Sequence, residues 1–176
     1  MKRFSTLFTP VLFVVGFFAA SVLADDLLVR FDGGVGVIPV SNVTVSTDTP
    51  PVVTVNRNIV RGVDPAGQIW ALAELRANVK MNGDIKVDGR GLIFGGGNNT
   101  GRATGQNVIA TLICEDLVQR STNPTGVPRA DNGDFKIDDV LAPWPPDNCN
   151  DPRLLIRNAG GTRGWFAAGI LKFIKD

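Results

Sequence analysis

The sequence contains no histidine and no tyrosine, and this limits the chemistry that its side chains can perform. Without histidine there is no Ser-His-Asp or Cys-His nucleophile pair, no imidazole acid–base group and no histidine ligand for zinc or copper. The serines lie in no Gly-x-Ser-x-Gly motif, and two cysteines are too few for a zinc site built from cysteine alone. We therefore assign no catalytic residue from the sequence.

Carboxylates are the remaining candidates for catalysis. Only Glu74 and Glu115 are glutamates, and the other acidic residues are aspartates. Two carboxyl groups on either side of a groove hydrolyse glycosidic bonds in many enzymes. However, the alternation of apolar and polar residues around Glu74 predicts that it lies on the solvent face of a strand. A carboxylate-dependent hydrolase acting outside the cytoplasm is therefore kept as an alternative.

The densest group of oxygen ligands lies between residues 131 and 139. Its members are Asp131, Asn132, Asp134, Asp138 and Asp139, of which the four aspartates are the candidate metal ligands. Calcium binds carboxylate oxygens presented by turns, so a calcium-stabilised adhesion domain is a second alternative, and calcium is the one cofactor suggested. The spacing fits no EF-hand loop, however, and an Asn-Gly hairpin turn followed by solvated acids accounts for the same residues.

Trp144 is the first residue that we would test for contact with a ligand. It lies in the segment Ala142-Pro143-Trp144-Pro145-Pro146, where successive prolines make the chain stiff and extended. An indole on such a segment can stack on a sugar ring or fill a pocket of a partner protein. The interpretation that we favour from the sequence, however, is that Trp144 covers an open end of the core. Trp70 and Trp165 lie in β-forming segments and are expected in the core.

The first 24 residues have the features of a Sec-type signal peptide. Lys2 and Arg3 precede an apolar stretch, and the segment 20–24 supplies the small residues that a signal peptidase reads. The competing prediction is an uncleaved anchor, because residues 4–24 carry no charge. We expect cleavage before Asp25, which leaves a single domain, residues 25–176, in the periplasm or secreted from the cell.

The two cysteines, Cys114 and Cys149, both fall in the exported part. In an oxidising compartment an isolated pair is most simply a disulfide, and two free buried thiols are the alternative. The exported part is also nearly neutral, since loss of Lys2 and Arg3 leaves 16 basic and 17 acidic residues. Nucleic acid and anionic membranes are therefore not expected as partners, and no second apolar segment of spanning length follows the signal peptide.

The stretch from residue 69 to 88 predicts a long antiparallel hairpin. Apolar residues occupy the odd positions from Ile69 to Met81, and Asn82-Gly83 marks a tight turn. A helix over residues 69–77 competes with this, because Asp64-Pro65 resembles a helix start. Elsewhere, short apolar runs alternate with turn residues. The sequence therefore predicts an all-β fold, an antiparallel β-sandwich of seven to nine strands.

Several short motifs resemble those of small exported bacterial β-rich proteins of unassigned activity. They are Arg61-Gly62-Val63, Trp70, Asn82-Gly83, Arg90-Gly91-Leu92, the two cysteines and Trp165-Phe166-Ala167-Ala168-Gly169. The resemblance implies export and a β fold, and it brings no functional residues with it. We predict an exported, non-catalytic protein that serves as a binding or structural, surface-associated module, with an unknown protein or carbohydrate as its partner.

Overall fold

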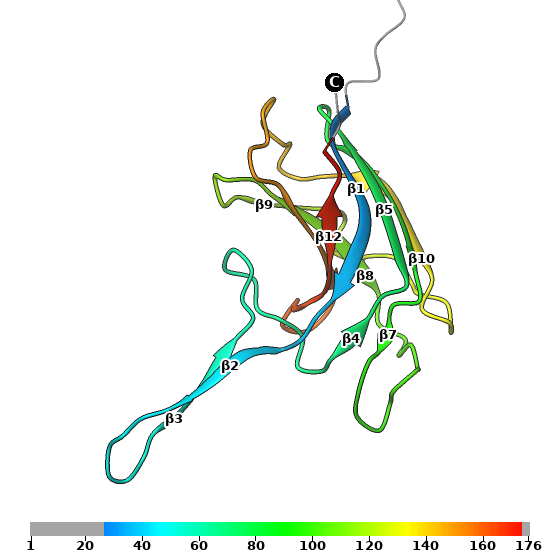
Figure 1. Ribbon diagram of the computed structural model, residues 1–176. Helices are drawn as coiled ribbons and strands as arrows, with labels where there is room; N and C mark the ends of the chain where they lie inside the picture. The colour runs from blue at the N-terminus through cyan, green and yellow to red at the C-terminus, as the bar shows by residue number, and fades with distance from the viewer. Residues whose placement is uncertain (1–26, 174–176) are drawn as a thin grey trace, which may run out of the picture.

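The computed structural model describes residues 27–173, so the predicted signal peptide lies outside the described residues. Within this range the chain forms twelve strands and no helix (Figure 1). The prediction of an all-β antiparallel fold is confirmed, and the competing helix over residues 69–77 is wrong. None of the described residues belongs to a helix of the length and apolarity that crossing a membrane requires.

Eight strands form one antiparallel sheet, in the order β10-β6-β5-β1-β12-β11-β8-β9. Its strands in chain order are β1 (Leu27–Gly36), β5 (Glu74–Lys80), β6 (Asp84–Arg90), β8 (Val108–Ile113), β9 (Gln119–Ser121), β10 (Phe135–Val140), β11 (Arg153–Asn158) and β12 (Trp165–Leu171). The sheet curls until its edges meet. Ser121 at the end of β9 exchanges two backbone hydrogen bonds, both 2.9 Å, with Ala142 just beyond β10. The result is a nearly closed, barrel-like sheet.

This architecture differs in detail from the expected sandwich of seven to nine strands. The described strands number twelve, and the core lies inside one curled sheet instead of between two stacked sheets. The reason is the position of β1, which pairs with β5 on one side and with β12 on the other. Strands that a sandwich would divide between two sheets therefore belong to one sheet here. A register shift between Phe31 and Gly34 marks an irregularity in β1, and such bulges increase the local twist of a sheet.

The central hairpin is present but begins later than predicted. β5 starts at Glu74 and pairs with β6 as far as Val79 and Ile85, with alternate side chains buried. Before Glu74 the alternation fails, because Ile69 is exposed and Trp70 is buried. The cause is that β4 (Trp70–Ala71) leaves the main sheet and pairs with β7 (Ile93–Phe94). As expected, Trp70 and Trp165 are both core residues, each 3% exposed.

The two similar segments 82–88 and 132–138 are neighbours in space, because β6 and β10 pair antiparallel. Their Asn-Gly turns therefore lie at opposite ends of the strand pair. Each turn glycine has a φ of +85° and accepts a backbone hydrogen bond through its carbonyl, Gly83 from Leu141 (2.9 Å) and Gly133 from Leu92 (3.1 Å). Each turn is thus held by residues just beyond the partner strand.

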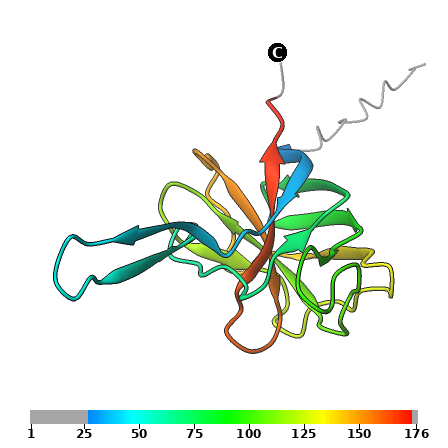
Figure 2. The same cartoon turned by 60° about the horizontal axis from the view of Figure 1, so that its bottom comes forward.

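A two-stranded arm, residues 38–58, projects from the body of the molecule (Figure 2). It consists of β2 (Val40–Val45) and β3 (Val53–Arg57), which pair antiparallel with each other and are the only strands of their sheet among the described residues. Every residue of both strands is exposed. The arm is therefore an extension that the core does not cover.

Candidate binding site at the Trp144 loop

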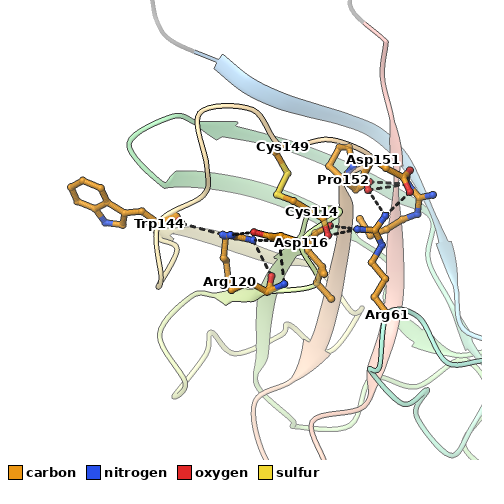
Figure 3. Close-up of a disulfide and its surroundings, with 11 residues drawn as sticks. Arg61, Cys114, Asp116, Arg120, Trp144, Cys149, Asp151 and Pro152 are labelled. Carbon is orange, nitrogen blue, oxygen red and sulfur yellow. Dashed lines mark hydrogen bonds and ion pairs between the residues drawn. A yellow bond between two sulfur atoms is a disulfide. The ribbon is translucent and has the colours of Figure 1, made fainter.

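A disulfide joins Cys114, just after β8, to Cys149, just before β11 (Figure 3). The predicted pairing is therefore present in the structure. The two cysteines are 35 positions apart, and the segment between them contains β9, β10 and the proline-rich loop that carries Trp144. The bridge fastens the end of this loop to the buried end of β8.

Arg120 fixes the backbone of the same loop from inside the molecule. Although charged, it is only 5% exposed. Its Nε donates a hydrogen bond to the carbonyl oxygen of Trp144 (3.1 Å), and its Nη1 donates to the carbonyl oxygen of Val118 (3.0 Å). Both terminal nitrogens also bind the carboxylate of Asp116. A guanidinium presents its donors in one plane, so this arrangement fixes the position of the Trp144 loop relative to the turn at residues 116–118.

The Arg120 contact also governs the charge of Asp116. The hydrogen bond from Arg120 is the main cause that lowers the pKa of this carboxyl from 3.8 to about 2, and the backbone N–H of Val118 adds to it. Asp116 is therefore ionised throughout the physiological pH range. A general acid for glycoside hydrolysis needs the opposite shift, a raised pKa. Glu74, the other carboxylate considered from the sequence, is exposed on β5 and lies 4.0 Å from Arg90.

The indole of Trp144 points away from the body and is 70% exposed. It therefore does not cover the end of the core. Leu117 is 62% exposed and Val118 is 40% exposed. Arg120 binds the carbonyl groups of both Val118 and Trp144, and so links the turn that carries Leu117 and Val118 to the loop that carries Trp144; we call these three exposed residues the Trp144 surface.

Leu117 has a left-handed backbone conformation, with a φ of 61°. This conformation is rare for a bulky residue and is normally kept only where the surrounding structure enforces it. Here the backbone N–H of Leu117 donates to the carbonyl oxygen of Cys114 (3.1 Å) and closes a tight turn. The turn presents the leucine side chain to solvent instead of to the core.

Arg61 ties the two ends of the disulfide loop together a second time (Figure 3). Its Nη1 donates to the carbonyl oxygen of Cys114, and its Nη2 donates to the carbonyl oxygen (2.7 Å) and the carboxylate of Asp151. The loop is thus closed by one covalent bond and by one arginine. A shallow hollow beside the loop is lined by Cys114, Glu115, Asp116, Pro146, Asn148 and Asn150.

The four aspartates considered for calcium are not brought together. Three have separate partners: Asp134 accepts from the N–H of Gly91 (3.0 Å), Asp138 binds Nζ of Lys86 (2.9 Å) and Asp139 accepts from the N–H of Asn123 (2.8 Å). Asp138 and Asp139 are successive residues of a strand, so their side chains point to opposite faces. Among residues 27–173, no group of three or more histidine, cysteine or acidic side chains is placed to hold a metal ion.

No pattern in the sequence pointed to a role for Arg120 or Leu117, and Arg61 stood out only as part of the motif Arg61-Gly62-Val63. Asp116 and Arg120 are four positions apart, but this spacing indicates a contact only within a helix, and here the chain forms a turn and a strand.

Comparisons of the chain with protein-family models, with curated proteins and with solved structures give no match.

Proposed function

We propose that the protein is an exported, non-catalytic binding module that contacts its ligand through Trp144. The observation that carries the proposal is an indole 70% exposed on a backbone that is fixed by Arg120, by the Ser121–Ala142 pairing and by the nearby disulfide. A rigid aromatic anchor contributes apolar contact area to binding and loses little conformational entropy when the ligand arrives.

Two observations support a site of action outside the cytoplasm. The sequence begins with the features of a cleavable signal peptide. The only two cysteines of the chain are joined in a disulfide, and such bonds persist mainly in oxidising compartments. The non-catalytic assignment is supported by the absence of histidine from the sequence and by the lowered pKa of Asp116, the carboxyl group that shares Arg120 with the Trp144 carbonyl.

A protein is the ligand that the Trp144 surface fits best. Leu117 and Val118 add exposed aliphatic area on the turn that Arg120 links to the Trp144 loop, and an aliphatic side chain has no hydrogen bond to offer to a sugar hydroxyl. A carbohydrate is the second candidate, since the neighbouring hollow presents the planar polar groups of Glu115, Asn148 and Asn150. Such groups bind hydroxyls in sites where an aromatic ring stacks on the sugar.

The test compares wild type, Trp144→Ala and Phe173→Ala, all expressed from the full-length chain. Phe173 is an equally accessible aromatic residue, 82% exposed, that lies outside the proposed site. Each protein is applied to a glycan array and, after immobilisation, to the extracellular and envelope fractions of the host. We expect Phe173→Ala to bind the same ligand as wild type. Trp144→Ala should bind that ligand with a Kd at least ~10-fold higher. Unchanged binding by Trp144→Ala would overturn the proposal.

A further inference from the structure

Two hollows adjoin at the end of the sheet opposite the disulfide. Cys114 follows the last residue of β8 and Asn107 precedes its first, so the six residues of β8 separate these ends by roughly 20 Å. The first hollow, of about 180 Å³, is lined by residues of β4, β7 and the turn that joins β11 to β12 (Figure 1). The second has a volume of about 600 Å³. Gln106 and Asn158 line both hollows, which we together call the amide groove.

Three aromatic rings form the floor of the first hollow. The ring centroid of Trp70 lies 4.2 Å from that of Phe94 and 4.2 Å from that of Phe166, and each of the three residues is at most 8% exposed. Arg129 packs over this group, with its guanidinium carbon 4.7 Å from the ring centroid of Trp70, and its nitrogens donate to three backbone carbonyl groups. The floor is therefore held in place before any ligand arrives.

The walls of the groove carry polar groups that have no partner inside the protein. Within residues 27–173 the side chains of Gln68 and Thr162 make no hydrogen bond. The side-chain amides of Gln106 and Asn158 each accept one hydrogen bond from a nearby residue through their oxygen, and their NH₂ groups have no acceptor in the described chain. These four side chains can therefore donate to and accept from a ligand at the same time.

The groove is uncharged. Among residues 27–173, none of those that line it is acidic or basic, although 20% of the whole chain is charged. Arg163 lies between Thr162 and Gly164 in the chain, but it is exposed and lines neither hollow. A charged ligand would find no opposite charge in the groove to replace its hydration. The groove therefore suits a neutral ligand that carries many hydrogen-bonding groups.

Three glycines of the groove leave space that nothing in the protein uses. They are Gly67 in the first hollow and Gly105 and Gly160 in the second. None has a φ in the left-handed region, and no atom beyond the adjacent residues lies closer than 3.9 Å to the place where a Cβ would stand. Every other glycine among residues 27–173 has either such a φ or a neighbour within 3.5 Å. Neither backbone conformation nor packing requires glycine at these three positions, and their effect is to keep the groove open.

We infer that the amide groove binds a neutral oligosaccharide, with one sugar ring in the first hollow and further rings along the second. This inference goes beyond the proposed function, because it concerns a different site, at the other end of the sheet from the Trp144 surface. Sugar hydroxyls donate and accept hydrogen bonds as side-chain amides do, and the apolar face of a sugar ring packs on aromatic rings.

A neutral peptide suits the groove less well. Extended peptides commonly bind by adding a strand to the free edge of a sheet. The strands that reach the groove are β8, β11 and β12, and each already has a neighbour on both sides. Recognition in the groove must therefore come from side chains and turns, which fits a sugar chain with hydroxyl groups on every unit.

The experiment applies protein expressed from the full-length chain to an array of neutral and uronic-acid oligosaccharides, and isothermal titration calorimetry then measures the Kd of each neutral oligosaccharide retained. A capped decapeptide of glycine, serine and glutamine is the peptide probe. Gly67→Leu/Gly160→Leu fills both hollows without crowding the fold, and Gln68→Leu/Gln106→Leu removes two amides but keeps the side-chain size. The matched control is Ala130→Leu, which adds bulk at an exposed residue outside the groove. Circular dichroism verifies that each variant is folded.

We expect wild type and Ala130→Leu to bind a neutral oligosaccharide with the same Kd, and both groove variants to bind it with a Kd at least ~10-fold higher. The inference is overturned if no neutral oligosaccharide is retained, if uronic-acid oligosaccharides or the peptide bind as tightly, or if the groove variants bind as wild type does. Trp144→Ala separates this inference from the proposed function, because it should keep the oligosaccharide while losing the ligand of the Trp144 surface. A sugar that Trp144→Ala loses and the groove variants keep belongs to the Trp144 surface, and contradicts the inference.

Discussion

Arg120 and Trp144 are joined by one hydrogen bond, in which the buried guanidinium Nε donates to the carbonyl oxygen of the residue that carries the exposed indole. The contact acts on the backbone and leaves the side chain of Trp144 free. The ring can therefore meet a ligand while the chain that supports it is held in place. This separation of a fixed backbone from an exposed ring is the main physical reason to regard the loop as a binding element.

Removal of the Arg120 side chain should destabilise the protein and loosen the loop. Arg120→Ala leaves the carbonyl groups of Val118 and Trp144 and the carboxylate of Asp116 without their shared donor. We expect a loss of about 2–4 kcal/mol in the free energy of unfolding, measured by urea titration. Arg153→Ala is the control, because Arg153 is 44% exposed in its ion pair with Asp151 and should contribute less than about 1 kcal/mol. Equal losses in the two variants would show that Arg120 has no special role.

Acid should weaken the protein partly through Asp116. Because Arg120 lowers the pKa of this carboxyl to about 2, from 3.8, the unfolded chain binds the proton first as the pH falls. The stabilisation is therefore complete above about pH 4 and is lost as the pH falls from there to about 2. Asp116→Asn should be less stable than wild type at pH 6, and the difference should shrink at pH 2.5. Urea midpoints at the two pH values measure it.

Some acid sensitivity should persist in Asp116→Asn. The hydrogen bond from Lys172 lowers the pKa of Asp32 as well, and this second carboxyl titrates in the same direction. A difference between wild type and Asp116→Asn that stays constant from pH 6 to pH 2.5 would contradict the role assigned to Asp116.

Loss of the disulfide should destabilise the protein without releasing the loop completely. For a loop of 35 residues, the chain-entropy estimate gives a stabilisation of about 3–4 kcal/mol. Cys114→Ser/Cys149→Ser should show this loss in chemical denaturation. In this variant Arg61 can still bind the backbone carbonyl oxygens of residues 114 and 151. The fluorescence emission of Trp144 should therefore stay close to that of wild type. Adding Arg61→Ala to the double variant should then make residues 114–151 accessible to proteases, and equal resistance in both variants would argue against the second closure.

The two Asn-Gly turns provide a matched pair of glycine substitutions. Gly83 and Gly133 have the same φ, +85°, but a Cβ at Gly83 would lie 3.4 Å from its nearest neighbours, and a Cβ at Gly133 would lie 2.6 Å from the backbone of Leu92. Gly83→Ala should therefore cost about 1–2 kcal/mol from backbone strain alone. Gly133→Ala should cost about 3–4 kcal/mol, because overpacking adds to the strain. Thermal or urea unfolding measures both, and equal losses would contradict this account.

Local patterns predicted those features that depend on neighbouring residues. The alternation from Leu75 to Val79 predicted a half-buried strand, and it is one. The pairing of Cys114 with Cys149 followed from there being no other cysteine. The break at Trp70 was not predictable, because the partner that removes it from the main sheet, β7, is more than twenty positions away.

Features that depend on distant residues escaped the sequence analysis. The edge pairing of Ser121 with Ala142, which turns an open sheet into a nearly closed one, leaves no periodic signal. The hydrogen bond from Arg120 to Trp144 joins residues 24 positions apart that meet only in the folded protein. The arm shows the limit most directly. Its valines alternate as in any half-buried strand, and the pattern predicts an apolar face without saying whether the same chain covers it.

The strand β1 has its two neighbours in widely separated parts of the chain, since Gly34 pairs with Gly169. During synthesis, the pairing of β1 with β12 can therefore form only after nearly the whole chain has been made. Such long-range closure is slow compared with the formation of local hairpins. A truncation before residue 165 would leave both β1 and β11 with an unpaired edge.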